Sequence, residues 1–205
     1  MLNDMIDSGS LIEFVLMNNK LYQRSKNKNK ADGSAVISGI CTINEHKAYV
    51  LFMDKTIRMG TMGVMEGEKI ALSFEFAARK HLPVIAIIAS GGVRVEEGTK
   101  ALMQMLKTII TVKKHSKKKL LYIAVVTNPT LGGVSASFVS LADIIIAESN
   151  AIFGFTGKRI IEESTRENLP DDFQTSNFAM KHGMVDMVLP KNELKQALSV
   201  LLKLH

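Results

Sequence analysis

The sequence has few of the residues that build metal sites and disulfides. Cys41 is the only cysteine among 205 residues, so the chain has neither an internal disulfide nor a cysteine-based zinc knuckle. No two histidines have the i, i+4 spacing of a helical zinc site, and the five are scattered: His46, His81, His115, His182 and His205. We therefore expect no metal site, and a Cys41 side chain that packs as a small buried apolar group.

Long apolar runs and a secretory signal are absent as well. No run approaches the roughly 20 apolar residues that span a bilayer. Asp4 and Asp7 interrupt the charged-then-apolar order of a signal peptide. With 46% hydrophobic and 22% charged residues, the chain has enough apolar material for the core of one globular domain. These features predict a cytoplasmic globular protein without a membrane span.

Positive charge exceeds negative charge, with a formal net charge of +6. The lysines gather in two runs, Lys26, Lys28 and Lys30, and then Lys113, Lys114, Lys117, Lys118 and Lys119. Such runs are usually solvated faces, and they also attract the phosphates of a nucleotide cofactor or of nucleic acid. Tryptophan is absent and no aromatic residue is interleaved with these lysines, which weighs against nucleic acid.

The pattern along the chain predicts an N-terminal helix and polar loop over residues 1–34 and one domain over residues 35–205. Within that domain, strands are expected at 36–40, 47–52, 84–89, 121–126, 144–147 and 151–155. Helices are expected at 64–80, 98–115, 131–141, 162–168, 178–182 and 193–204. Strands that alternate with helices predict a layered α/β fold whose ligands bind beyond the carboxyl ends of the strands.

The helix expected at 98–115 carries many apolar side chains. We expect its inward face to consist of Leu102, Met105, Leu106, Ile109 and Ile110. Its lysine-rich carboxyl end suits the helix dipole.

Two strand-to-helix turns share one design, an apolar strand followed by a pair of glycines. The first is Ser90-Gly91-Gly92 and the second is Leu131-Gly132-Gly133. Glycine lets backbone N–H groups point at a ligand, and a helix N-terminus adds partial positive charge, so two such turns together suit one oxyanion. A pair of glycines after a strand also occurs as a mere tight turn, and both interpretations stay open on this pattern alone.

The chain has no nucleophile-elbow motif, no phosphate-binding loop and no dinucleotide fingerprint. Anion cradles without a side-chain nucleophile indicate chemistry by enolate stabilisation. The neighbouring pair Glu96 and Glu97 suggests a hydratase as an alternative, but adjacent side chains diverge on a helix and are poorly placed to act on one substrate atom. Arg94 is compatible equally with a phosphate contact and with a salt bridge to Glu96, Glu97 or a partner.

Several segments, in their order and spacing, resemble the β subunit family of bacterial acetyl-CoA carboxylase carboxyltransferases. They are residues 59–63, 89–94, 102–105, 129–138, 154–162, 169–170, 173–176 and 183–188. The resemblance implies a single-domain, crotonase-like ββα spiral in which amides of the two glycine turns form oxyanion holes. The implied reaction is the biotin-dependent transfer of a carboxyl group from carboxybiotin to acetyl-CoA, which gives malonyl-CoA for fatty-acid synthesis.

The resemblance also implies site residues and partners. The N–H donors to the thioester enolate or the biotin ureido oxygen are expected from Gly91, Gly92, Gly132 and Gly133. Substrate contacts are expected from Gly60, Met62, Ser90, Arg94 and Thr130. The expected partners are a carboxyltransferase α-type subunit and a biotin carboxyl carrier protein in a hetero-oligomer, and the lysine runs are candidates to assist the CoA phosphates.

The sequence departs from the family pattern at three places, one of which is Arg58-Met59-Gly60-Thr61-Met62-Gly63, where the family commonly has Met-Gly-Gly-Ser-Met-Gly. It lacks the four-cysteine zinc ribbon with which the family usually begins, so no zinc is expected. It also has Gly157-Lys158-Arg159 where the family commonly has Gly-Pro-Arg. These differences leave two alternatives open. One is a paralogous carboxylase or decarboxylase subunit for another acyl-CoA, and the other is a non-catalytic nucleic-acid-binding or regulatory relative.

Overall fold

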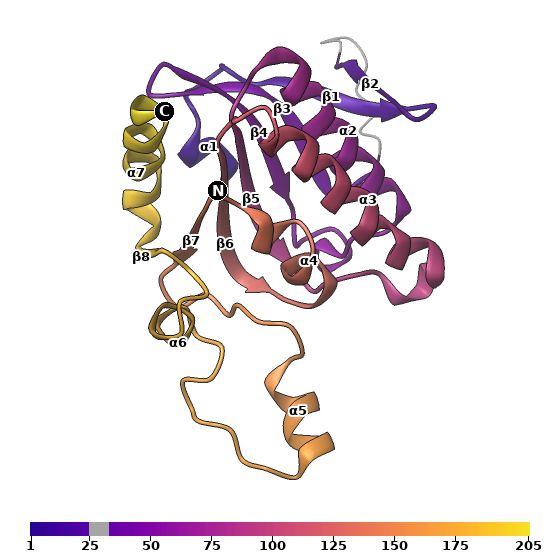
Figure 1. Ribbon diagram of the computed structural model, residues 1–205, viewed down its shortest axis with the longest axis vertical. Helices are drawn as coiled ribbons and strands as arrows, with labels where there is room; N and C mark the ends of the chain where they lie inside the picture. Colours follow the sequence, from indigo (N-terminus) through magenta and orange to yellow (C-terminus); the bar gives the residue numbers. More distant parts are fainter. Residues whose placement is uncertain (25–32) are drawn as a thin grey trace.

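The computed structural model describes residues 1–24 and 33–205. Its strands form one mixed sheet with the order β2-β1-β3-β4-β5-β6-β7-β8 (Figure 1). The first half pairs antiparallel and consists of β1 (Ile12–Met17), β2 (Lys20–Gln23), β3 (Val36–Ile43) and β4 (His46–Met53). From β4 onward the pairing is parallel, through β5 (Val84–Ser90), β6 (Tyr122–Thr130), β7 (Ile144–Glu148) and β8 (Met187–Leu189).

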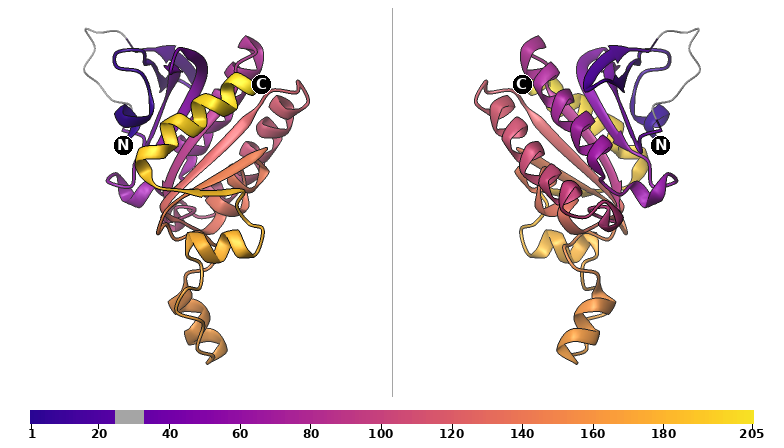
Figure 2. Two further views of the ribbon diagram at one scale, coloured as in Figure 1. Left: turned by 90° about the vertical axis from the view of Figure 1, so that its left-hand side faces the viewer. Right: turned by 90° about the vertical axis from the view of Figure 1, so that its right-hand side faces the viewer.

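Helices cover both faces of this sheet (Figure 2). Helices α2 (Val64–Lys80) and α3 (Thr99–Ser116) lie on one side, and α1 (Leu2–Met5) and α7 (Lys191–Leu204) lie on the other. Every residue of β5 is buried, and its side chains alternate between the core beneath α2 and the core beneath α7. The prediction of a strand buried on both faces is therefore confirmed.

The N-terminal segment differs from its predicted helix and polar loop. Only Leu2–Met5 is helical, whereas β1 and β2 form a hairpin that extends the main sheet next to β3. Asn18 and Asn19, with φ of 49° and 56°, form its tight turn, because asparagine tolerates positive φ. The lysine run Lys26, Lys28 and Lys30 lies outside the described residues.

Helix α3 has the predicted length, but most of its predicted inward face is wrong, since Met105 packs against the core while other residues of that face are exposed. Leu102, Leu106 and Ile110 are 57%, 51% and 46% exposed, and the helix instead buries small and polar side chains against α2. A Cβ added at Gly67 of α2 would lie 2.6 Å from Cγ of Gln104, so the two helices approach closely at this point. The missing side chain of Gly67 leaves the space that Gln104 occupies, so this polar residue of α3, rather than a leucine, lies at the contact.

The region after β6 is more irregular than the sequence predicted. The helix expected at 131–141 is broken into α4 (Gly132–Ala136) and the 3-10 turn η3 (Val139–Leu141), and the strand expected at 151–155 makes only isolated bridges. Further along, α5 (Lys158–Thr165) lies on an arm that projects from the body, and α6 (Ser176–Lys181) brings the chain back (Figures 1 and 2). Two short 3-10 turns, η1 (Arg58–Gly60) and η2 (Val95–Glu97), flank the first glycine turn.

Candidate active site

The two glycine turns lie against each other at the carboxyl ends of β5 and β6. A Cβ placed on Gly132 would lie 3.1 Å from Cα of Gly92, and one placed on Gly92 would lie 3.2 Å from Cα of Gly132. Both residues have positive φ, 111° at Gly92 and 65° at Gly132. Side chains at either position would separate the turns, so the glycines are required here. The prediction that the turns lie together is confirmed.

Internal hydrogen bonds fix the first turn. The N–H of Gly91 donates to the carbonyl of Met59 at 3.0 Å, and the N–H of Gly92 donates to Oγ of Ser90 at 3.1 Å. The Ser90 hydroxyl in turn donates to the carbonyl of Gly60 at 2.7 Å. Both amides that sequence analysis assigned to the ligand on this turn are therefore already bonded within the protein.

Pairing with Met62 decides which amide of the first turn stays available. Met62 donates its N–H to the carbonyl of Gly92 at 2.8 Å and accepts from the N–H of Arg94 at 2.9 Å. In a parallel bridge of this kind, the residue between the two bonds directs its own N–H to the opposite side. That residue is Val93, and a Cβ placed on Gly132 would lie 3.9 Å from its nitrogen. Within the described residues, the Val93 N–H has no acceptor.

The second turn is held in the same manner. Gly132 donates its N–H to the carbonyl of Phe155 at 2.8 Å, and Leu131 donates to the carbonyl of Ser90 at 3.0 Å, which ties the two turns together. The N–H of Gly133 finds no acceptor in the described part of the chain. A Cβ placed on Gly92 would lie 3.6 Å from the Gly133 nitrogen, so this amide faces the first turn.

Two amides at the contact between the turns, those of Val93 and Gly133, are thus without an acceptor among residues 1–24 and 33–205. Both residues are partly exposed. Gly133 was among the residues proposed from sequence, whereas Val93 was missed, because only its pairing with the distant Met62 distinguishes it from Gly91 and Gly92. A pair of adjacent unbonded amides suits one oxyanion. The anticipated helix dipoles contribute little, because α4 has only five residues and the first turn enters a 3-10 turn.

The Arg94 side chain is bonded to other residues of the protein. It is 5% exposed, and its Nη1 lies 2.7 Å from Oε1 of Glu97 and 3.0 Å from Oε2 of Glu66, which confirms the salt bridge to Glu97 considered from sequence. Its Nε and Nη2 donate to Oγ1 and the carbonyl oxygen of Thr61. Burial opposes the charge of Arg94, but the bonds to the two carboxylates outweigh it and raise the pKa of the guanidinium.

Three of the remaining residues expected to contact substrate have buried side chains. Met62, Ser90 and Thr130 are fully buried. The Thr130 hydroxyl donates to the carbonyl of Ile88 at 2.9 Å, which fixes the start of the second turn. A Cβ on Gly60 would overlap the carbonyl of Ala89, so this glycine allows the 3-10 turn to approach β5.

The second lysine run lies far from the glycine turns. Lys117 to Lys119 precede β6, whereas Gly132 follows it, and a strand of nine residues is about 30 Å long. These lysines are thus at the opposite end of the sheet, which argues against the expected contact with CoA phosphates at the turns. Lys55 and Lys191 line a cavity of about 540 Å³ beside the ends of β4, β5 and β6 and supply positive charge at the near end.

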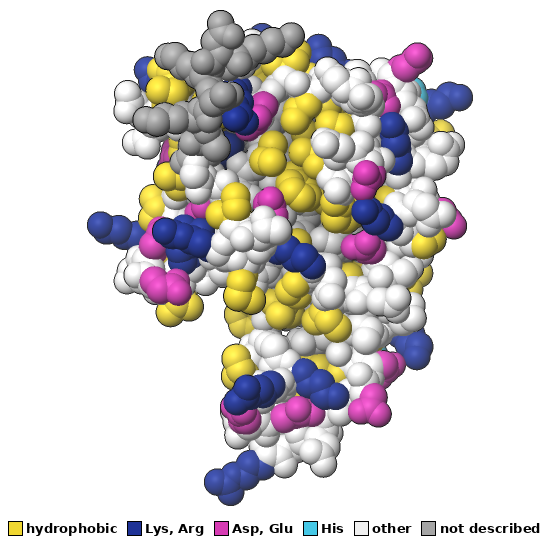
Figure 3. All heavy atoms as spheres, turned by 180° about the vertical axis from the view of Figure 1, so that it is seen from behind, with side chains coloured by type: hydrophobic (Ala, Val, Ile, Leu, Met, Phe, Trp, Pro, Cys, Tyr) yellow, Lys and Arg dark blue, Asp and Glu magenta, His cyan; other side chains and the backbone are white. Residues whose placement is uncertain are grey.

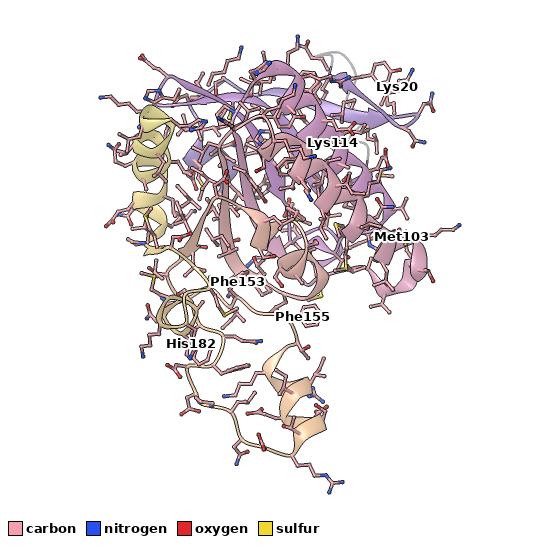
Figure 4. The ribbon with its side chains drawn as sticks, in the orientation of Figure 1. Lys20, Met103, Lys114, Phe153, Phe155 and His182 are labelled. Atoms are coloured by element: carbon pink, nitrogen blue, oxygen red, sulfur yellow. The ribbon has the colours of Figure 1, made fainter. Side chains whose placement is uncertain are left out.

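The surface around the site is apolar in several places. Figure 3 shows a band of hydrophobic side chains on the rear face, with lysine and arginine side chains beside it. Met59, Val95 and Phe155 are 67%, 84% and 60% exposed, and Figure 4 places Phe155 where the arm leaves the body. Among the described residues, no three His, Cys, Asp or Glu side chains are grouped to hold a metal ion, and no helix is long and apolar enough to cross a membrane.

A model of the carboxyl transferase domain matches residues 3–200 of the chain. The chain belongs to the carboxyl transferase domain family. Among solved structures, transcarboxylase 12S with methylmalonyl-coenzyme A and methylmalonic acid bound is 24% identical with a TM-score of 0.81. The match covers 98% of this chain but only 40% of the transcarboxylase chain, so this carboxyl transferase domain spans less than half of that relative.

Two further solved structures show the same fold. The malonate decarboxylase MdcD–MdcE hetero-dimer from Pseudomonas is 20% identical with a TM-score of 0.77, over 98% of this chain and 82% of that one. The geranyl-CoA carboxylase β subunit from P. aeruginosa is 17% identical with a TM-score of 0.79, over 100% of this chain and 38% of that one. The predicted crotonase-like α/β fold is confirmed.

Proposed function

We propose that this carboxyl transferase domain binds the thioester oxygen of an acyl-CoA through the N–H groups of Val93 and Gly133. The observation that carries the proposal is that these two amides alone, of the six at residues 91–93 and 131–133, have no acceptor within the described chain. Preorganised donors that face developing negative charge are a large source of catalysis, and loss of one typically costs about 10²- to 10³-fold in rate.

The chemistry follows from where negative charge develops. Loss of a proton from the α-carbon of an acyl thioester gives an enolate, and its charge lies on the oxygen that the two amides bind. Carboxybiotin on a carrier protein would supply the carboxyl group, and its ureido nitrogen, once free of CO₂, would take up the α-proton. The new C–C bond forms at the α-carbon, so acetyl-CoA becomes malonyl-CoA. Because biotin would take up the proton, the reaction requires no side-chain base of this domain, and Glu97 is paired with Arg94.

The residues around the turns then hold the Val93 and Gly133 amides in position. Ser90 binds the amide of Gly92 and accepts from Leu131, and thereby fixes the relative position of the turns. Met62 orients Val93, and the Arg94 side chain secures the first turn to the segment that contains Thr61. We assign these residues to geometry rather than to substrate contact, which revises the role proposed from sequence. Gly60 and Thr130 serve the same purpose at the strand ends.

An α-type carboxyltransferase subunit and a biotin carboxyl carrier protein are the proposed partners in a hetero-oligomer. The exposed apolar side chains of Met59 and Phe155 support this, because their carbonyls hold Gly91 and Gly132 while their side chains stay in solvent. A partner that covers these side chains would exclude water from the enolate, which strengthens the hydrogen bonds to it.

A decarboxylase subunit is the second candidate. The malonate decarboxylase hetero-dimer shares the fold of this domain, with a TM-score of 0.77. An oxyanion site that stabilises the enolate serves carboxylation and decarboxylation alike, because both pass through the same charge on the thioester oxygen.

Reconstitution separates these candidates. The chain is combined with the α-type subunit and the carboxylated carrier, and malonyl-CoA formed from acetyl-CoA is followed by mass. Formation only in the complete mixture supports the proposal, whereas formation by the chain and carboxylated carrier alone contradicts the need for an α-type partner. Loss of CO₂ from a malonyl thioester, without carboxyl transfer, would favour the decarboxylase. Tight binding of labelled RNA without binding of labelled acetyl-CoA would favour the non-catalytic relative.

A further inference from the structure

Helix α3 turns its apolar side chains toward solvent. Leu102, Met103, Leu106 and Ile110 are 57%, 55%, 51% and 46% exposed. In the right-hand view of Figure 2, no other element of the described chain covers this helix. We call these four side chains the α3 stripe.

The opposite face of α3 carries the polar residues. Gln104, Thr108, Thr111 and His115 are all buried, and the smaller apolar residues Ala101 and Val112 are buried beside them. A helix that packs on a globular domain normally buries its apolar side and exposes its polar side. Because α3 leaves four large apolar side chains exposed on one side, the α3 stripe is suited to contact with a second surface, since contiguous exposed apolar patches on soluble proteins mark interaction sites.

The positive charge of α3 indicates what kind of partner surface would complement it. Residues Thr99–Ser116 contain four lysines and no aspartate or glutamate. Lys107 and Lys114 pair with Glu68 and Glu75 on α2, whereas Lys100 and Lys113 have no acidic partner in the described part of the chain (Figure 4 labels Met103 and Lys114 on this helix).

A second copy of this chain would place lysines opposite lysines, and the whole chain already carries a net charge of +6. An apolar surface with an acidic rim, on a different chain, complements α3 instead.

The α3 stripe is continuous with the candidate active site. Met105, which lies between Met103 and Leu106 on the same helix, reaches the second glycine turn, because a Cβ placed on Gly133 would lie 2.7 Å from its Sδ. A partner that covers α3 would therefore also lie beside one of the two unbonded amides. An occupant of this surface is thus placed to complete the site rather than to bind at a remote face.

We propose that the α3 stripe, with Lys100 and Lys113 at its rim, is the docking surface for an acidic-rimmed apolar helix of the α-type subunit. This inference rests on the proposed function. It predicts that docking depends on apolar contact along α3 and on charge at its rim. It also predicts that the chain without its partner is a monomer with an exposed apolar surface.

Lysine substitutions on α3 test the docking surface. Leu106→Lys and Leu102→Lys should leave the fold intact, because both positions are half exposed and lysine forms helix about as well as leucine. Val200→Lys on α7, which is 46% exposed, is the matched control on another face. Dissociation constants for the purified α-type subunit are measured by titration, and thermal melting checks the fold of each variant.

We expect Leu106→Lys to weaken binding by at least about 30-fold, as for a central interface residue, and Val200→Lys to leave it unchanged. Lys100→Glu with Lys113→Glu should slow association by about tenfold at low salt, with a smaller effect at high salt. Unchanged affinity of a folded Leu106→Lys variant for an α-type subunit that still supports carboxyl transfer would overturn the docking surface and leave the proposed function standing. Self-association that Leu106→Lys abolishes would identify a second copy as the occupant and also overturn the proposal.

Discussion

Removal of the Arg94 side chain measures what holds the first glycine turn in place. Arg94→Met keeps much of the side-chain volume but leaves the buried carboxylate of Glu66 without its counter-ion. Breaking a buried ion pair by removing one partner typically costs about 3–5 kcal/mol, because the remaining charge stays buried. Glu66 is 2% exposed, and its retained bonds from the N–H groups of Ala35 and Gly63 favour the lower end of that range.

Urea denaturation tests this value. With a slope of about 2 kcal/mol per molar urea, a loss of about 3 kcal/mol lowers the unfolding midpoint by about 1.5 M. Arg159→Met is the matched control, because Arg159 pairs with Glu163 on α5 while 89% exposed, and such surface pairs contribute about 0–1 kcal/mol. Equal, small losses for the two variants would refute the positioning role of Arg94. A raised KM for acyl-CoA without any loss of stability would restore the phosphate contact considered from sequence.

Three further predictions concern other parts of the domain. Hydrogen bonds from the Glu45 N–H, Lys195 and Thr42 hold the pKa of Asp7 far below its usual range, so its contribution to stability is present above about pH 4 and is lost as pH falls. Asp7→Asn should therefore lower the melting temperature at pH 7 and flatten its decrease toward pH 3, and parallel curves for both proteins would contradict this. Burial raises the pKa of the Cys41 thiol to about 12, so a thiol reagent at pH 8 should label only unfolded protein, and rapid labelling of native protein would refute the burial. Gly132→Ala should cost about 1–3 kcal/mol, because alanine at a φ of 65° is strained and its Cβ would lie 3.1 Å from Cα of Gly92, whereas Gly157→Ala meets no atom within 4 Å and should be neutral in melting.

Much of the fold follows from local sequence pattern. The predicted bounds of α2 are those of the structure, because Gly63 precedes the helix, its apolar residues recur with helical spacing, and Pro83 lies just beyond its end. The doubly buried β5 was likewise evident from an uninterrupted apolar run. The hairpin of β1 and β2 was missed because its strands gain their stability from pairing with β3, which lies farther along the chain.

The orientation of α3 was missed for a related reason. Periodicity identifies an apolar face but not which surface covers it, and the sequence was interpreted as if this domain alone provided that surface. At the contact with α2, Gln104 occupies the space beside Gly67 instead. An apolar helix face that the sequence suggests is part of the core can therefore equally be an interface with another chain. The tertiary structure distinguishes these two cases.

The sequence predicted that the two glycine turns lie together, but not which of their amides are unbonded. The glycine pairs located both turns, since a pair of glycines after a buried strand permits a close approach of two backbones. Sequence does not show which amide is already bonded, because the acceptors for Gly91 and Gly132 come from Met59 and Phe155. The identity of the available donors is thus a property of tertiary structure.

Amide resonances of the two turns test the central claim most directly. The ¹⁵N-labelled chain is titrated with a non-hydrolysable acyl-CoA analogue whose carbonyl carries partial negative charge, and backbone amide proton shifts are followed by NMR. We expect downfield shifts at Val93 and Gly133, where new hydrogen bonds form, and little change at Gly91, Gly92 and Gly132, whose N–H groups are already bonded. Downfield shifts at Gly91 or Gly92, with Val93 and Gly133 unchanged in the bound state, would contradict the account.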